Sequence, residues 1–420
     1  MFDDNGRATD VRGWQAAGLS LAAGGIAATR GPGAVAAVVA LAPMVWAFGR
    51  LHRNAPSAGS TSDAVAKVLG VRTGLLTGLV QLAGYLLLAV GIARGPGLAV
   101  ALLLVDDVES VTTSWWWPVW AVVAAILATA LTYFCRTRLV VSIAAILAAA
   151  GMLVYFYVAL SVIARVATGT VPHPIAGVAP QSGMGTSTLL IVFGLTLLGV
   201  EAVTTLNSRV SSVSRPIGSA MAVIALCAAT GWVAVALASD TALAFDEYQI
   251  VLRASDLFSG AGSLWLMVSS VALGSAALLA ITLAAVRVAS RLTQQMSQQS
   301  RGGAVTLVFG VVTSMLLIVA IEDWGGAGSK LAGVAPLLLI AVYVIAAEAN
   351  SRLPGSSDAA MVLRVLMPTL AVVVVLVPLG YYDFDAESLW PAALAAATVA
   401  VAALVAFRLS GDRIQIQQPT

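Results

Sequence analysis

One acidic side chain, Glu201, lies deep inside a long apolar stretch of the chain, Phe193 to Pro216 (FGLTLLGVEAVTTLNSRVSSVSRP). An ionised carboxylate at bilayer depth is costly, so such a group usually faces a partner or a cavity and marks a functional site. Desolvation disfavours the charged form of a carboxyl group, which suits Glu201 to take up and release a proton. The alternative is an ordinary membrane helix in which Glu201 bonds to neighbouring backbone.

Glycines mark possible breaks in two apolar segments. Gly194 and Gly199 precede Glu201, and Gly24 and Gly25 lie near the middle of an earlier segment rich in small residues. A membrane helix opens only where its residues tolerate non-helical backbone. Broken helices in corresponding positions of two halves of a chain are typical of transporters built from inverted repeats. For Gly24 and Gly25, close helix packing is the alternative and is equally compatible with the sequence.

Two broken helices would suit a zwitterionic ligand. The N-terminus of a half-helix offers unpaired N–H groups and a positive dipole end to a carboxylate, while freed carbonyls accept hydrogen bonds from an ammonium group.

Signals for other chemistry are missing from the sequence. It has no phosphate-binding loop and no nucleophile elbow. Cys135, Cys227, His52 and His173 do not have the spacing of metal ligands. We therefore expect no enzyme activity, no metal and no cofactor.

The composition predicts a membrane protein with many spans. Hydrophobic residues make up 60% of the chain and charged residues only 10%, and the mean hydropathy is +0.95, whereas a soluble domain has roughly 25% charged residues. The net charge of +2 is spread over short loops, so no nucleic-acid partner is expected. The first 13 residues are polar and lack the apolar core of a cleavable signal peptide.

Apolar runs of about 20 residues, the length that spans a bilayer, predict twelve helices. They cover residues 14–29, 33–49, 74–105, 117–134, 139–164, 187–206, 216–239, 261–286, 304–321, 331–349, 363–380 and 389–408. The third run is interrupted at Arg94–Gly97, where we expect the helix to bend or end.

The loop charges predict an even number of spans with both termini in the cytoplasm. Most of the 22 Lys and Arg residues fall in alternate loops, and such loops face the cytoplasm. The exceptions are Arg30, Arg94, Arg165, Arg253 and Lys330. The protein is therefore expected in the inner (cytoplasmic) membrane of the cell, with membrane lipid around it.

Three segments carry a resemblance to a known family. Residues 193–216 are similar to the sixth helix and following loop of the amino acid, polyamine and organocation (APC) transporter superfamily. The matching positions are Gly199, Val200 and Glu201, followed by Ser214, Arg215 and Pro216. Residues 50–70 resemble the family's loop between helices two and three, with Pro56, Ala58, Gly59 and Ser60 standing for its Pro-x-Gly-Gly-Ser run. Residues 269–291 are similar to its eighth helix, and together with the twelve spans the resemblance covers almost the whole chain.

The resemblance implies an all-α domain over residues 1–420 with a five-plus-five inverted repeat. The first repeat would cover residues 1–164 and the second 187–349, with two extra helices in 363–408. Helices one and six would be broken around the substrate. Backbone contacts to the substrate are implied for Ala23, Gly24, Gly25, Ile26 and Ala27, and for Phe193, Gly194, Leu195, Thr196 and Leu197. Leu195 and Leu198 fall at gating positions, and Glu201 would sense or carry a proton.

The implied function is secondary active transport of amino acids or related amines by alternating access, with proton coupling. The closest alternative is an exchanger or exporter, and a non-transporting sensor or assembly subunit is the alternative of another class. Two departures from the family pattern limit what the resemblance implies about the substrate and about the alignment of helix one. Helix six has Leu and Thr where relatives have aromatics, which favours a small apolar substrate side chain. The interval from Gly25 to Gly59 is shorter than the pattern requires. No oligomeric state is assigned.

Overall fold

The computed structural model describes residues 11–56, 58–104, 116–169, 199–210, 212–238, 261–296, 327–355, 358–381 and 386–416. Within these ranges the regular elements are helices, and there are no strands. Seven of the described helices are long and apolar enough to cross a membrane. The fold is thus that of a helical membrane protein, as the composition predicts. Twelve spans in an inverted repeat stay a prediction, because helix 304–321 and most of helix 187–206 lie outside the described residues.

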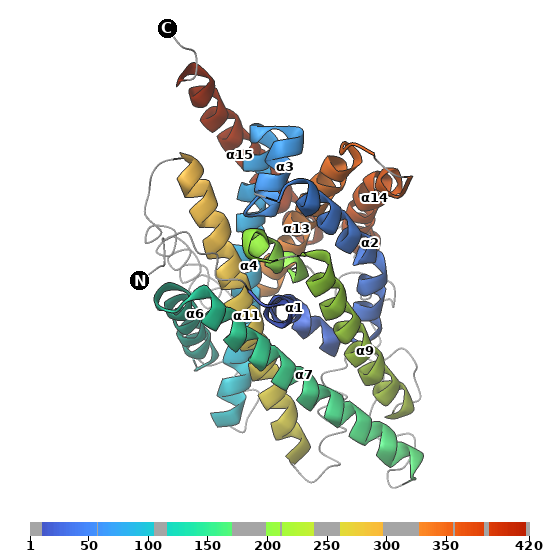
Figure 1. The fold of residues 1–420 in the computed structure, drawn as a ribbon. Helices are drawn as coiled ribbons and strands as arrows, with labels where there is room; N and C mark the ends of the chain where they lie inside the picture. The colour runs from blue at the N-terminus through green and yellow to red at the C-terminus, as the bar shows by residue number, and fades with distance from the viewer. Residues whose placement is uncertain are drawn as a thin grey trace.

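The first half of the chain forms α1 (Gly13–Gly24), the 3-10 helix η1 (Gly25–Arg30), α2 (Pro32–Asn54), α3 (Thr61–Leu69), α4 (Val71–Leu104), α6 (Trp116–Phe134) and α7 (Thr137–Ala167). The second half forms the 3-10 helix η3 (Val200–Arg209), α9 (Ser214–Ala238), α11 (Ala261–Met296), α13 (Ala327–Ser351), α14 (Asp358–Tyr381) and α15 (Ala386–Ile416). Figure 1 shows α1 near the middle of the bundle, where it contacts α7, α9, α11 and η3.

Small residues let the central helices approach closely. A Cβ atom on Gly18 of α1 would lie 2.2 Å from the Cβ of Ala145 on α7, and one on Gly151 of α7 would lie 2.7 Å from Leu273 on α11. Such positions draw helices together in a membrane, where apolar burial alone gives no preference for protein over lipid. The small residues therefore let α7 pack closely against both α1 and α11.

The third predicted helix neither ends nor breaks near Arg94, because α4 continues through Gly95, Pro96 and Gly97 to Leu104. Its neighbours are shaped to accept it. A Cβ on Gly274 of α11 would lie 2.5 Å from the ring of Pro96, and one on Gly97 would lie 2.6 Å from the Trp117 carbonyl oxygen of α6. Packing against α11 and α6 holds this segment helical despite the proline.

The loops that carry most of the basic residues meet at one end of the bundle, which we call the basic end. Three contacts join them: Arg50 donates to the Gly355 carbonyl at 2.7 Å, the Arg72 guanidinium lies 4.9 Å from the ring centroid of Phe407, and Arg287 donates to the Thr137 hydroxyl. In Figure 1 this end is at the top, with α3 and the C-terminal part of α15, while α7 and α9 end at the bottom. The side of the membrane that the basic end faces stays a prediction.

Candidate functional site

Helix one changes its type at the predicted glycines. α1 ends at Gly24, and the chain continues from Gly25 as the six-residue 3-10 helix η1, without an extended break. Gly31 then turns the chain with φ 48°, and Pro32 begins α2 at once. The second half of helix one is therefore very short, which explains the short interval between Gly25 and Gly59.

Both glycines of helix one are closely packed. A Cβ on Gly24 would lie 3.2 Å from Ile224 and 3.5 Å from Val200, and one on Gly25 would lie 3.2 Å from Met152. Close helix packing is thus observed at these glycines, and Gly24 also lies directly against the start of η3. Ala23, Gly24, Gly25 and Ala27 are buried and Ile26 is half-buried. The other predicted substrate residues, Phe193, Gly194, Leu195, Thr196 and Leu197, lie outside the described residues, as does the gating position Leu198.

Gly199 begins the sixth-helix segment in a conformation that favours glycine. Its φ is 119°, a region that other residues rarely adopt. A Cβ there would lie 3.0 Å from Ile281 of α11, 3.3 Å from Leu88 of α4 and 3.7 Å from the Ala23 carbonyl oxygen. The turn that leads into η3 thus passes between α4, α11 and the end of α1.

Glu201 is fully buried and accepts three hydrogen bonds. The Tyr85 hydroxyl donates to Oε1 at 3.0 Å, while the Tyr343 hydroxyl and the Gly199 N–H donate to Oε2 at 2.5 and 2.7 Å. None of the salt bridges formed by the described residues involves Glu201. Three donors satisfy an ionised carboxylate, which can only accept. A protonated carboxyl group must itself donate once, and its buried O–H stays without an acceptor unless one of the tyrosine hydroxyls turns its own proton elsewhere and accepts from it.

The Glu201 carboxylate joins three elements, because Tyr85 lies on α4 and Tyr343 on α13. Gln81 of α4 donates from Nε2 to the Tyr85 hydroxyl at 3.0 Å. Phe48 of α2 packs edge-on against the Tyr343 ring, with centroids 5.3 Å apart. Glu201 therefore has both the partners that a functional carboxylate needs and, through Gly199, the backbone bond of the alternative interpretation.

Sequence reasoning missed Gln81, Tyr85 and Tyr343. A signal for the first two was present, since Gln81 and Tyr85 are polar groups four residues apart in an apolar helix and so share one face. Their contact with Glu201 could not be predicted, because helix patterns do not tell which side chains of α4 and α13 meet η3.

The loop that resembles the family's second-to-third helix connection contacts η3 through α3. The Thr61 hydroxyl donates to the Thr204 hydroxyl at 2.9 Å. Both side chains are buried. Ser60 caps α3 by accepting from the Asp63 N–H, and Asp63 accepts from the Gly59 N–H. This reciprocal capping explains why a Gly-Ser pair precedes α3. A polar contact thus links the site to the basic end.

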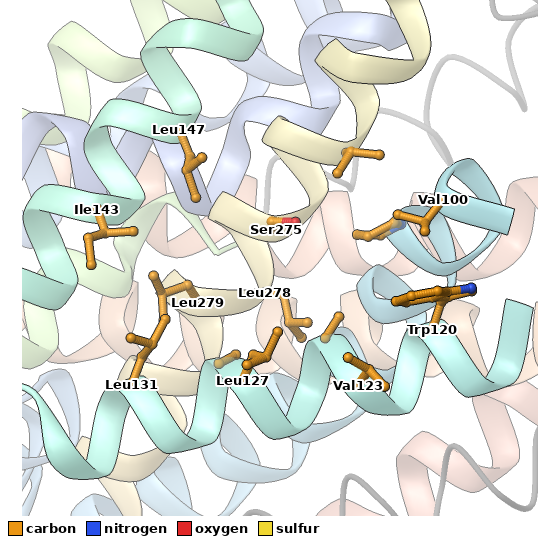
Figure 2. A pocket seen from close by; sticks show the side chains of 14 residues that line it. Val100, Trp120, Val123, Leu127, Leu131, Ile143, Leu147, Ser275, Leu278 and Leu279 are labelled. Carbon is orange, nitrogen blue, oxygen red and sulfur yellow. The ribbon is translucent and has the colours of Figure 1, made fainter. Parts of the chain in front are cut away.

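A separate hollow of about 320 Å³ lies between α4, α6, α7 and α11. Figure 2 shows Trp120, Val123, Leu127 and Leu131 of α6 on one side and Leu278 of α11 on the other. Leu127 is 57% exposed, so the hollow opens on the outer surface of the bundle. Its lining is apolar apart from Ser275 and the indole N–H of Trp120, and it includes no predicted site residue. It cannot satisfy the charges of a zwitterion.

No protein-family model matches the chain, and no curated protein matches it. Among the described residues, no three His, Cys, Asp or Glu side chains come together as they would around a metal ion. The geometry around Glu201 is therefore the feature of the molecule that points to a function.

Proposed function

We propose that this chain is a secondary active transporter that moves amino acids or related amines across the cytoplasmic membrane by alternating access with proton symport. The observation that carries the proposal is the position of Glu201. This buried carboxyl group is held by hydrogen bonds from Tyr85 of α4, Tyr343 of α13 and the Gly199 N–H, directly beside the change of helix type at Gly24. Intramembrane carboxyl groups with such partners are typical of proton relays in transporters.

The packing of the helices supports an inverted repeat of the APC type. In such a repeat, the first, second and third helices correspond to the sixth, seventh and eighth. Each described member of these pairs packs on its counterpart: α1 on η3, α2 on α9, and α4 on α11. The contacts α4–α13 and α7–α11 are also equivalent to one another under this correspondence. These pairings are expected of two halves related by a two-fold axis in the membrane plane.

Proton coupling follows from the hydrogen bonds of Glu201. When ionised, the carboxylate holds η3 to both Tyr85 and Tyr343. Protonation replaces one acceptor position by a donor, which weakens the connection of η3 to α4 or α13. A proton shifts the balance between two conformations only if it binds one of them more tightly. Substrate that prefers the same conformation is then coupled to the proton.

The surroundings of the helix-one glycines favour a substrate with a small, apolar side chain. Their nearest neighbours are Val200, Ile224, Met152 and Leu273, which carry no charge. A charged substrate side chain would be left without a partner there, at a high cost in desolvation. The ammonium and carboxylate groups would instead bond to backbone at the change of helix type after Gly24 and at the predicted break in helix six.

The test is uptake by purified protein in liposomes, using a pool of labelled neutral amino acids and amines. Each is offered with and without an inward proton gradient, and with and without unlabelled amino acids inside. Accumulation driven by the gradient is the expected result. Uptake only against internal amino acid would replace the symporter by an exchanger, and the absence of uptake and of efflux under every condition would contradict transport.

A further inference from the structure

Two buried polar side chains near the basic end have no hydrogen-bonding partner among the described residues. His52, near the end of α2, is 3% exposed, and both its Nδ1 and Nε2 atoms are unpaired. Asn350, near the end of α13, is 0% exposed, and both Oδ1 and Nδ2 are unpaired. Buried imidazole and amide groups without partners are costly, and in folded proteins such groups are usually satisfied by each other or by ordered water.

These two side chains lie on faces of α2 and α13 that meet. The edge-on contact between Phe48 and Tyr343 fixes which faces these are. His52 follows Phe48 by four residues and Asn350 follows Tyr343 by seven, so the helical repeat puts each on the same face as its aromatic residue. At 1.5 Å per residue, His52 and Asn350 lie about 6 and about 10 Å beyond the aromatic pair toward the basic end.

Gln81 extends the row of unpaired polar atoms to Glu201 itself. Its Nε2 donates to Tyr85, but its Oε1 is buried and unpaired. α4 begins at the basic end and packs against α13, and Gln81 is one turn nearer to that end than Tyr85. Unpaired polar atoms therefore occur from the level of the Glu201 partners to the ends of α2 and α13.

We propose that Gln81, His52 and Asn350 line a narrow, water-filled passage through which protons reach Glu201 from the basic end. The proposal rests on the proposed function, because a proton path to Glu201 has a use only if its protonation is coupled to transport. The basic end is the end predicted to face the cytoplasm, so the passage would serve the release of protons there and their return.

The groups on this path can move a proton without any other co-reactant. A neutral imidazole has one donor and one acceptor, so His52 can accept a proton at one nitrogen and release one from the other. Water passes protons in the same way, and the amides of Gln81 and Asn350 orient it. At the last step a tyrosine hydroxyl accepts a proton as it donates its own to the Glu201 carboxylate. One proton enters the path and one is bound at Glu201, so charge and atoms balance.

The charged groups around the interface between α2 and α13 lie at its outer edge, toward the basic end. They are Arg50 and Arg53 on α2, Asp63 and Lys67 on α3, Arg215 on α9, Glu348 on α13, and Arg364 on α14. All of them are half-buried or exposed, and Glu348 is paired with Arg352 and Arg364. Among the described residues, His52 is therefore the buried titratable group that lies between these charged residues and the two tyrosines, Tyr85 and Tyr343.

The test is the water access of single cysteines, which needs no known substrate. Cys135 and Cys227 are first replaced by Ala, and then His52→Cys and Asn350→Cys are made one at a time. The matched controls are Leu51→Cys and Ala349→Cys, since Leu51 and Ala349 are both 0% exposed and directly precede the test residues on other faces of the same helices. The probe is a small, positively charged methanethiosulfonate reagent applied to purified protein in detergent.

We expect labelling at positions 52 and 350 to be at least ~10-fold faster than at 51 and 349, because the reagent attacks the thiolate, which an apolar surrounding suppresses. A test position labelled no faster than its own control, whether both rates are slow or fast, would overturn the passage at that position. Gel filtration checks that each variant is folded, and each test residue with its control decides the question independently of the other pair.

A transport measurement then separates a proton path from a structural role. Asn350→Leu keeps a similar volume but removes the polar atoms. Uptake driven by a pH gradient is expected to fall several-fold, while exchange of labelled for unlabelled substrate at uniform pH falls far less. An equal loss of both activities would contradict the path. If the unaltered protein shows no uptake at all, the proposed function fails, whereas the cysteine labelling still decides whether the passage exists.

Discussion

The hollow between α4, α6, α7 and α11 and the cluster around Glu201 are opposites. The first has about 320 Å³ of space but an almost wholly apolar lining, while the second is fully buried and rich in polar atoms. An apolar hollow forgoes only dispersion contacts, and lipid chains can supply these. A buried carboxylate without donors would cost far more. Hydrogen bonds to buried polar groups, and not the size of a cavity, are therefore the basis on which we propose the functional site.

The largest effect on transport is expected at the Glu201 cluster, from Glu201→Gln, which keeps the shape of the side chain but cannot ionise. Uptake driven by a proton gradient should fall by about 5- to 150-fold, the range of a typical coupling free energy. The measurement is initial uptake in liposomes as a function of external pH, and the pH dependence should flatten. The matched control is Glu348→Gln, which removes only partly exposed ion pairs to Arg352 and Arg364. Unchanged uptake with unchanged pH dependence in Glu201→Gln would refute its role.

Gly199→Ala should be the most destabilising of the conservative changes at the site. Positive φ costs a residue with a side chain about 1–3 kcal/mol, and the new methyl group would also lie 3.0 Å from Ile281. The measurement is the midpoint of thermal unfolding of the purified protein. Gly70→Ala is the control, because Gly70 has φ 93° but nothing within 4 Å of its Cβ position. An equal loss of stability in both variants would mean that packing at Ile281 adds nothing.

Tyr85→Phe and Tyr343→Phe each remove one donor to Glu201. A hydrogen bond to a charged group contributes about 1.5–3 kcal/mol, so each variant should lower stability by about that amount. The two effects should not add, since both tyrosines serve one carboxyl group. Thermal unfolding of the single and double variants measures this, with Tyr157→Phe as control because Tyr157 is 69% exposed. Fully additive losses would argue against a shared carboxylate.

The smallest effect is expected in the apolar hollow. Ser275→Val places extra methyl groups in the space seen in Figure 2, and filling such a cavity commonly adds about 0.5–2 kcal/mol of stability. Uptake should stay the same, because the hollow has no group that transport requires. A large loss of uptake in this variant, with stability maintained, would show that the hollow takes part in transport and would reverse the comparison.

Much of the helical architecture was predictable from residue patterns. Apolar runs place α6, α7 and α9 within about three residues of their observed bounds, since a helix that meets lipid must be apolar over its whole length. The helices α2 and α11 begin where predicted but end at Asn54 and Met296, later than their apolar runs. The alternation of Arg and Lys predicted which loops share one end, and contacts such as that between Arg50 and Gly355 bring these loops together. The helix does not end near Pro96, because the glycine on α11 makes room for the proline ring, and a bend there stays a prediction.

That Glu201 has hydrogen-bonding partners could also be inferred from the chain alone, because one carboxyl group in an apolar segment must find partners whatever the fold. The identity of those partners could not. Tyr85 and Tyr343 are 116 and 142 residues away from Glu201 in sequence, and they meet it only because α4 and α13 pack around the turn at Gly199. The cost of burying a charged side chain depends on that residue and its local sequence, so it can be predicted from composition and pattern. A hydrogen bond between distant helices depends on their register and rotation, which arise only when all the helices pack together.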